Sequence, residues 1–200
     1  AMVTLAQLHA QLGNHDAAIE NADRALAIIG SEKINEMDSA TAALWTQQAA
    51  DLPMLKAQVF SGAGRFEEAA AGFRAISEAN PDDVLAMRNL AGVLIRMGNE
   101  AEAFGVYDEI LARPGLEAAD FYTIGVGFYT GSEYGRAVEA FSGAAGINTN
   151  DRDAIEMWAR SLQLDSAYAA IPEVAARWIA LDPYNQNAYL VSAQALNING

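Results

Sequence analysis

The sequence predicts an all-α fold made of helix hairpins, and three observations support this prediction. Alanine, the best intrinsic helix former, makes up 42 of the 200 residues. Only five prolines occur, most of them between helix-like stretches, and no sustained run alternates apolar and polar residues as strands do. The third observation is a spacing of 34 residues that recurs along the chain. A fixed period of this length is typical of repeat architectures, in which each unit is one supersecondary motif.

The 34-residue spacing appears at three kinds of position. Turn-type residues recur at Gly64, Gly98, Ser132, Ser166 and Gly200, each near the end of an apolar periodic segment. Alanines recur at Ala69, Ala103 and Ala137, and aromatic residues recur at Phe73, Tyr107 and Phe141. Each kind keeps its own place relative to the turn, which predicts one repeated unit rather than chance similarity.

Within one period, the apolar residues form two helical stripes that are separated by a turn. In residues 84–117, Leu90 and Leu94 belong to a stripe with three- and four-residue intervals, which is typical of an amphipathic helix. Gly98 interrupts this stripe, and a second stripe begins at Ala103. The unit is therefore predicted to be a helix, a turn and a second helix.

This pattern resembles the tetratricopeptide repeat, a 34-residue helix–turn–helix unit. In residues 118–151 the resemblance is carried by Phe121, Ile124, Gly125, Phe128, Ala137, Phe141 and Ala144. Residues 152–185 depart most, with Ile171 and Ala175 in place of the alanine and the aromatic residue. The resemblance implies a right-handed α-solenoid of stacked antiparallel hairpins. Its units are approximately 1–32, 50–83, 84–117, 118–151, 152–185 and 186–200, the last being a first helix only or a cap.

Small and large residues alternate on the predicted first helices. The small residues let the two helices of a unit approach closely, and the large ones fill the space toward the next unit. The small positions are Ala57, Ala91, Gly125 and Ala159, and the large ones are Phe60, Leu94, Phe128 and Leu162. One hairpin cannot bury its apolar face alone, so stacking is expected to supply the core.

The first unit is offset from the others by 17 extra residues, at about 33–49. Because their apolar residues keep helical spacing, we expect a helical insertion that lengthens both arms of one hairpin. The turn of this hairpin is predicted near 37–39, with Asp38 as the cap of the returning helix, and kinks are predicted near 30–31 and 51–53. An additional separate helix remains the alternative.

Both ends of the chain fall within a unit. We expect either that the chain is a piece of a longer array or that its last helix is itself the cap. Tyr189, Leu190 and Leu196 form an apolar stripe on that last helix, which could mediate self-association.

The composition argues against several classes of function. With no cysteine, the chain has no disulfide, thiolate metal site or cysteine nucleophile. Acidic residues outnumber basic ones 26 to 12, which disfavours a nucleic-acid partner. No apolar run reaches the roughly 18 residues of a membrane span, so no membrane insertion is expected. The compartment stays open between cytoplasm and periplasm, because a cysteine-free chain suits either.

No residue pattern indicates catalysis, and we expect no enzyme, cofactor or metal. His9 and His15 have no second ligand at metal spacing, and His9 is expected to pack in the position of later aromatic residues. The acidic pairs 67–68 and 82–83 fall at helix starts, where negative charge favours the helix dipole. The glycines of 125–131 fall within a helix rather than between a strand and a helix, so they do not indicate a nucleotide site.

In the resembling family, first helices line a concave groove that holds an extended peptide or a partner helix. Carrying those positions across predicts groove residues Gln58, Arg88, Arg96, Tyr122, Tyr129, Glu156, Arg160, Gln163 and Gln194. Arginines bind carboxylates bidentately and tyrosines offer rigid contact area, so the partner is expected to be a protein or peptide with an acidic group. The family's carboxylate clamp is not expected, because Met54 and Gln58 stand where its first lysine and asparagine belong.

The predicted function is a non-catalytic scaffold or adaptor that binds a protein or peptide in this groove. Two alternatives remain: a regulatory or docking segment of a larger enzyme, and a self-association module.

Overall fold

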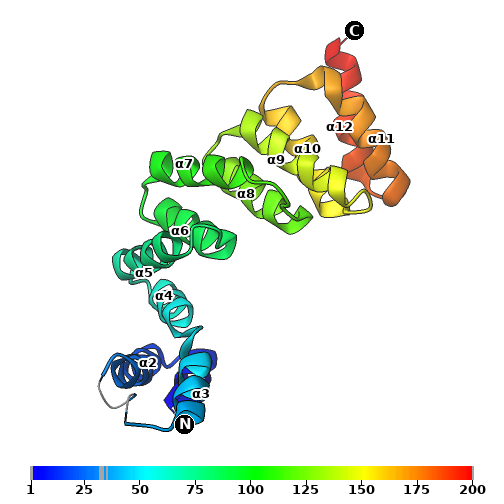
Figure 1. Cartoon of the computed structure of the whole chain (residues 1–200). Coiled ribbons are helices and arrows are strands. Elements are labelled where there is room, and N and C mark those ends of the chain that lie inside the picture. Colours follow the sequence, from blue (N-terminus) through cyan, green and yellow to red (C-terminus); the bar gives the residue numbers. More distant parts are fainter. Residues whose placement is uncertain (1, 32–33, 35, 200) are drawn as a thin grey trace. The chain divides into compact units, whose positions relative to one another are not determined.

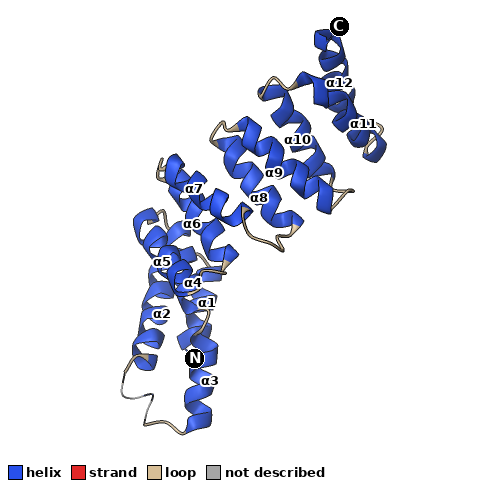
Figure 2. Cartoon of the chain, turned by 45° about the horizontal axis from the view of Figure 1, so that its top comes forward, coloured by secondary structure: helices blue, strands red, loops and turns tan. Residues whose placement is uncertain are grey.

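The computed structural model describes residues 2–31, 34 and 36–199, and in this part of the chain all regular structure is helical (Figures 1 and 2). The all-α prediction is therefore confirmed. The helices are α1 (Met2–Gln11), α2 (His15–Ile29), α3 (Ser39–Ala49), α4 (Leu52–Gly62), α5 (Phe66–Ala79), α6 (Val84–Arg96), α7 (Glu100–Leu111), α8 (Ala118–Thr130), α9 (Tyr134–Ile147), α10 (Arg152–Leu164), the 3-10 helix η2 (Tyr168–Ala170), α11 (Ile171–Leu181) and α12 (Gln186–Asn199). None of these helices is long and apolar enough to cross a lipid bilayer.

The chain forms two compact modules. The N-terminal module, Ala1–Val106, contains α1 to α6 and the first part of α7, and the C-terminal module, Tyr107–Gly200, contains the rest. In the N-terminal module, α1 packs against α2, and α5 packs against both α4 and α6. In the C-terminal module, α9 packs against α8 and α10, and α11 packs against α10 and α12. Helices that are consecutive in sequence therefore pack as consecutive hairpins, as the resemblance implied.

Five turns between paired helices have the same backbone geometry. The residues with left-handed backbone angles are Gly13, Gly64, Gly98, Ser132 and Ser166, with φ between 62° and 78°. At each turn, the N–H of the next residue donates to the carbonyl five positions before it, at 2.8–2.9 Å. The left-handed residue itself donates to the carbonyl three positions before it, at 3.0–3.3 Å. This pair of bonds is the Schellman motif, which ends a helix.

The recurring spacing of 34 residues is therefore a spacing of identical helix ends. Gly200 takes the next position in this series and lies outside the described residues. Two of the turns use serine at the left-handed position. A Cβ in this conformation costs roughly 1–2 kcal/mol, so Ser132 and Ser166 are held there by the packing of their hairpins.

Small residues allow close approach within the hairpins, as predicted. Gly125 is buried in α8, and a Cβ at this position would lie 2.8 Å from the ring of Phe141 on α9. Ala57 takes the same register in α4, and a Cβ on Gly72 of α5 would lie 2.9 Å from the Ala57 Cβ. The large residue three positions after the small one is buried in four units: Phe60, Leu94, Phe128 and Leu162. Each hairpin therefore interlocks small and large side chains.

Acidic residues cap the helices that follow the closing loops. Asp83 accepts a hydrogen bond from the N–H of Ala86 at 2.9 Å, and Asp151 accepts one from Ala154 at 3.0 Å. These caps satisfy backbone donors that have no partner within the helix. The prediction that the carboxylate of Asp83 serves a helix start is confirmed.

The segment between α2 and α4 differs in part from the prediction. Asp38 caps α3 as expected, because its carboxylate accepts a hydrogen bond from the N–H of Thr41 at 2.9 Å. The predicted longer second helix is wrong. Helix α2 ends at Ile29, where the N–H of Gly30 donates to the carbonyl of Leu26.

Among the described residues, the α-helical part of the predicted insertion is Ser39–Ala49. Gly30 ends α2 instead of kinking a longer helix. Glycine destabilises a helix interior, so a helix readily terminates at this residue. Residues 32, 33 and 35 of the predicted insertion lie outside the described residues.

Helices α3 and α4 are separated by a short break. Ala50 and Asp51 lie between them, and both keep right-handed helical backbone angles, so the chain bends without reversing. Pro53 explains the break, because it has no N–H to donate to the carbonyl of Ala49. The kink that the sequence predicted at this place is confirmed.

Candidate functional site: clefts on the first helices

The predicted groove residues lie on first helices of both modules. In the N-terminal module they are Gln58 on α4 and Arg88 and Arg96 on α6. In the C-terminal module they are Tyr122 and Tyr129 on α8, Glu156, Arg160 and Gln163 on α10, and Gln194 on α12. The two sets are described separately, each within its own module.

Four of the predicted residues line one cleft, which we call the C-terminal cleft. Tyr129, Arg160, Gln163 and Gln194 surround a volume of 360 Å³ between α8, α10 and α12. The cleft is also lined by Leu164, Trp178, Asn187, Leu190 and Val191. The cleft has the volume of a small-molecule site, and polar and apolar groups contribute about equally to its lining.

The polar wall of the C-terminal cleft is partly preorganised. The side chain of Gln163 donates a hydrogen bond to Gln194 at 2.9 Å, which links α10 to α12. The ring of Tyr129 packs edge-on against Tyr134, with ring centroids 5.6 Å apart. Trp178 is fully buried beneath, and within the described residues its indole Nε1–H has no hydrogen-bond partner. The cleft therefore combines amide and hydroxyl groups with an apolar floor.

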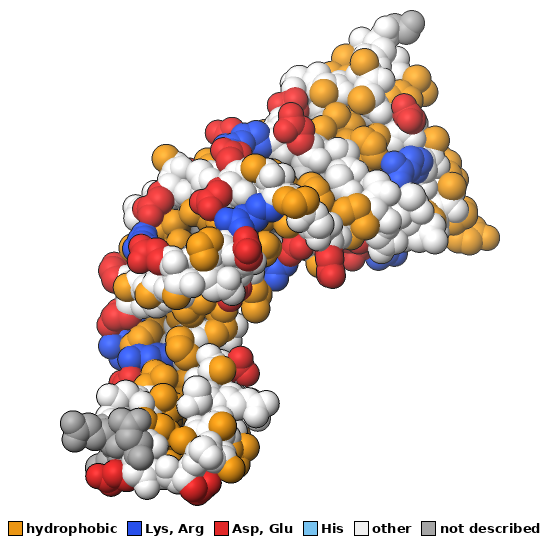
Figure 3. Space-filling view, viewed as in Figure 1, with side chains coloured by type: hydrophobic (Ala, Val, Ile, Leu, Met, Phe, Trp, Pro, Cys, Tyr) orange, Lys and Arg blue, Asp and Glu red, His pale blue; other side chains and the backbone are white. Residues whose placement is uncertain are grey.

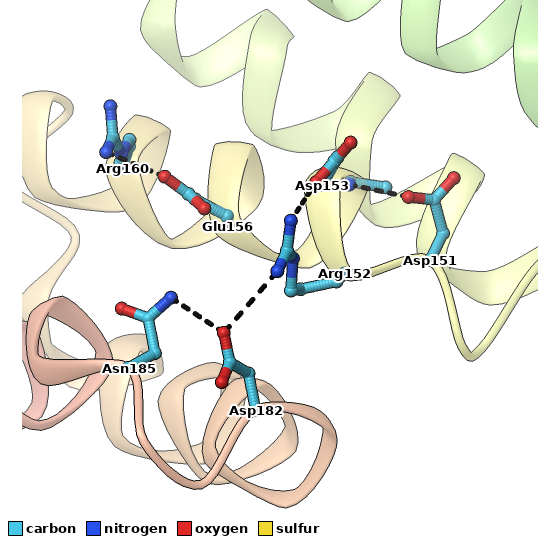
Figure 4. Close-up of polar contacts among 8 residues, drawn as sticks. Asp151, Arg152, Asp153, Glu156, Arg160, Asp182 and Asn185 are labelled. Atoms are coloured by element: carbon cyan, nitrogen blue, oxygen red, sulfur yellow. Dashed lines mark hydrogen bonds and ion pairs between the residues drawn. The ribbon is translucent and has the colours of Figure 1, made fainter.

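Ion pairs along α10 determine how much charge the cleft presents (Figure 4). Arg160 contacts Glu156 at 2.6 Å, one helical turn away, and this pair is partly exposed. Arg152 contacts Asp153 at 3.4 Å and Asp182 at 3.5 Å, and Asn185 donates to Asp182 at 3.1 Å. The guanidinium of Arg160 is therefore shared with a carboxylate of its own helix before any partner arrives.

Tyr122 lies in a different electrostatic environment from Tyr129. Burial raises the pKa of the Tyr122 phenol, and the carboxylates of Asp153, Asp151 and Glu156 raise this pKa further. Tyr122 is therefore surrounded by acidic groups. Neither Tyr122 nor Glu156 lines the C-terminal cleft.

In the N-terminal module, Gln58 is the predicted residue that lines clefts. It borders a cleft of 600 Å³ between α1 and α4, together with Gln7 and His15. It also borders a cleft of 300 Å³ that extends to Gln48 of α3. Neither Arg88 nor Arg96 lines either cleft, and the guanidinium of Arg96 lies 5.8 Å from the ring centroid of Phe66. Gln58 and these arginines therefore do not line a common cleft among the two described here.

Several lining residues of the C-terminal cleft were missed by sequence reasoning. Leu190 lies 34 residues after Glu156, so its register alone could have identified it. The same step leads from Asp153 to Asn187. Trp178 lies on a second helix, and no sequence signal distinguished it from an ordinary core residue.

The histidines are packed rather than clustered. His9 and His15 are half-buried, and each has a buried Nδ1 with no hydrogen-bond partner in the described part of the chain. Among the described residues, no group of three or more histidine or carboxylate side chains could hold a metal ion.

Comparison with protein families identifies the repeats. Residues 54–120 and residues 1–31 each match a profile of the tetratricopeptide repeat. Together with the identical helix ends at the 34-residue spacing, these matches establish the class. The chain belongs to the tetratricopeptide-repeat family.

Solved structures of several such proteins share the fold. A crystal structure of MamA is 19% identical over 72% of this chain and 84% of its own, with a TM-score of 0.59. YrrB, described as a TPR protein with an unusual peptide-binding site, is 16% identical over 82% of this chain and 84% of its own, with a TM-score of 0.62. A tetratricopeptide repeat protein from Parabacteroides merdae is 14% identical over 100% of this chain and 72% of its own, with a TM-score of 0.67. No curated protein sequence matches the chain.

Proposed function

We propose that this chain is a non-catalytic scaffold or adaptor module that binds a protein or peptide through its first helices. The observation that carries the proposal is the convergence of Tyr129, Arg160, Gln163 and Gln194 on the C-terminal cleft. The peptide-binding site named for YrrB supports the same use of the fold.

The partner is proposed to carry an acidic group that docks at Arg160. Planar guanidinium groups bind carboxylates with two parallel hydrogen bonds. Arg160 already forms an ion pair with Glu156 at 2.6 Å. An acidic partner must therefore displace the Glu156 carboxylate from the guanidinium. Exposed ion pairs between residues one turn apart contribute only about 0.3–0.5 kcal/mol, so displacing Glu156 costs little binding free energy.

The two members of this ion pair give opposite tests. Peptides would be selected from a random displayed library on the wild-type protein, and their affinities measured by fluorescence anisotropy. Arg160→Gln should weaken acidic peptides about tenfold, because a charge-assisted hydrogen bond is lost. Glu156→Gln should tighten the same peptides, because Arg160 is then released.

Arg24→Gln is the matched control. Arg24 and Glu20 form the same kind of pair, one helical turn apart on α2, at 3.9 Å and exposed to solvent. This variant should bind the peptides as the wild type does. The proposal is contradicted if Arg160→Gln and Arg24→Gln bind the selected peptides equally well.

A second proposal is that copies of the chain associate through α12. Leu196 is 57% exposed, whereas Leu162 and Phe128, which take the same register on α10 and α8, are 3% and 0% exposed. Helix α12 has no charged residue, although the chain has a formal net charge of −14, so two copies can meet there without like-charge contacts. Self-complementary surfaces of this kind form two-fold dimers.

Light scattering coupled to size-exclusion chromatography tests this second proposal. The wild type should shift from monomer toward dimer as its concentration rises, and Leu196→Gln should stay monomeric. Exposed Leu181 on α11 provides the control, because Leu181→Gln should associate like the wild type. A wild type that remains monomeric at high concentration rules the proposal out.

A further inference from the structure

A large side chain near the start of the first helix fills the end of the α8–α9 hairpin. In the α8–α9 hairpin this side chain is Phe121, which packs against Gly143 so closely that a Cβ on the glycine would lie 2.8 Å from the ring. The same register is taken by Ile155 on α10 and Met87 on α6, and both are buried. A large apolar residue therefore occupies this register in α6, α8 and α10.

The α4–α5 hairpin differs at this register. The residue in the register of Phe121 is Pro53, and the residue in the register of Gly143 is Ala75, each 68 positions earlier. Both line a cleft of 930 Å³, which we call the N-terminal cleft. The short proline ring leaves the space that Phe121 fills in the other hairpin.

The floor of the N-terminal cleft is apolar. It includes Leu26 of α2, Phe60 of α4 and Ile76 of α5. Alanines 71, 75 and 79 follow one another at four-residue intervals along α5, and all three are exposed to solvent. Hydrophobic side chains reach the surface over α4 (Figure 3).

The charged lining of this cleft is mainly acidic. Asp51, Glu68 and Asp83 line it, and the basic residue among its lining residues is Lys56. Lys56 pairs with Asp23 at 2.5 Å and Glu68 pairs with Arg65 at 2.7 Å, so both charges are partly compensated, and Asp51 and Asp83 carry the acidic character of the lining. An occupant with basic groups would therefore meet a complementary potential, whereas an acidic one would be repelled.

We propose that the N-terminal cleft receives a peptide segment of a partner protein that inserts an aromatic side chain flanked by lysine or arginine. The aromatic ring takes the place that Phe121 takes in the α8–α9 hairpin. The basic groups lie near the carboxylates at the rim. Buried aromatic anchors of this kind commonly dominate the affinity of an interface. The C-terminal cleft takes no part in this interaction.

The test uses a short synthetic peptide with one central tryptophan flanked by lysines. Its binding to the whole chain would be measured by fluorescence anisotropy of a labelled peptide. Peptides with alanine in place of the tryptophan, or glutamate in place of the lysines, should bind at least about tenfold more weakly. Amide NMR signals of Ala71 and Ile76 should shift on titration with the tryptophan–lysine peptide.

The decisive variant places a large side chain on the wall of the N-terminal cleft. Ala75 is exposed, so Ala75→Phe is expected to fold and to abolish binding by occupying the space. Ala180 is an exposed alanine on the second helix α11 of the other module, and Ala180→Phe should bind as the wild type does.

Circular dichroism would establish that both variants are folded. The proposal is overturned if the tryptophan–lysine peptide does not bind, if the glutamate peptide binds equally well, or if folded Ala75→Phe binds like the wild type. Variants of Arg160 should leave this binding unchanged, which separates its failure from failure of the proposed function.

Discussion

The α4–α5 and α8–α9 hairpins share a turn but differ in their packing. Both turns are Schellman motifs with a left-handed residue, Gly64 in one and Ser132 in the other. The α8–α9 hairpin is closed by Phe121, whereas the equivalent end of α4–α5 opens into a cleft of 930 Å³. The two hairpins therefore share the backbone geometry of their turns and differ in how their ends are packed.

The largest expected effect comes from removing the equivalent aromatic residues of the two second helices. Phe141 and Phe73 are both buried, and replacing a buried phenylalanine by alanine costs about 3–5 kcal/mol. We expect Phe141→Ala to lie near the top of this range, because Gly125 and Tyr122 pack tightly around the ring. Phe73→Ala should lie near the bottom, because the open hairpin can collapse.

Hydrogen exchange resolved by residue measures the two costs within their own modules. The loss of unfolding free energy should be larger for Phe141→Ala than for Phe73→Ala. Equal costs would show that the open end of α4–α5 does not soften its core.

The next effect concerns the turns. Ser132→Gly should stabilise the C-terminal module by roughly 0.5–1 kcal/mol, because it removes Cβ strain at φ 64° but adds freedom to the unfolded chain. Gly64→Ser should destabilise the N-terminal module by about 1 kcal/mol for the opposite reason. Hydrogen exchange measured in each module checks the predicted stabilisation by Ser132→Gly and the predicted destabilisation by Gly64→Ser. A destabilising Ser132→Gly would mean that serine is not strained there.

The smallest effect is a pH dependence confined to the closed hairpin. The pKa of Tyr122 is raised on folding, so the neutral phenol is favoured in the folded state. Its contribution to stability is fully present below the unfolded value near pH 10 and is lost as the pH rises through the raised value. Met54 takes the same register in α4 and does not titrate.

Tyr122→Phe should therefore flatten the loss of C-terminal stability above pH 10, as followed by urea unfolding at several pH values. A wild-type slope that Tyr122→Phe does not alter would contradict the assigned environment of Tyr122.

Much of the fold could be predicted from the sequence, because the signals for it are local. Gly64 and Gly98 indicate turns by themselves, and the 34-residue spacing extends this prediction to the serines at the equivalent positions. Asp38 was recognisable as a cap for the same reason. The end of α2 at Ile29 was not predicted, because its apolar spacing continues past Gly30 and only the three-dimensional structure shows which of these residues pack.

The candidate site was predictable only as a set of positions. Helix register identified Arg160 and Gln163 as neighbours on one face, but it could not show that Glu156 occupies Arg160. The sequence did not indicate the N-terminal cleft, since Pro53 predicted only a kink in a helix. Its meaning depends on comparison with Phe121, which packs against a residue from another helix.

The most direct test of the central claim is the amide NMR spectrum of the whole chain, titrated with an acidic peptide selected on the wild type. Binding through the first helices should concentrate the shifts of the C-terminal module at Tyr129, Arg160, Gln163 and Gln194, and these shifts should fade in Arg160→Gln. Shifts confined to the second helices α9 and α11, and unchanged in that variant, would contradict binding through the first helices.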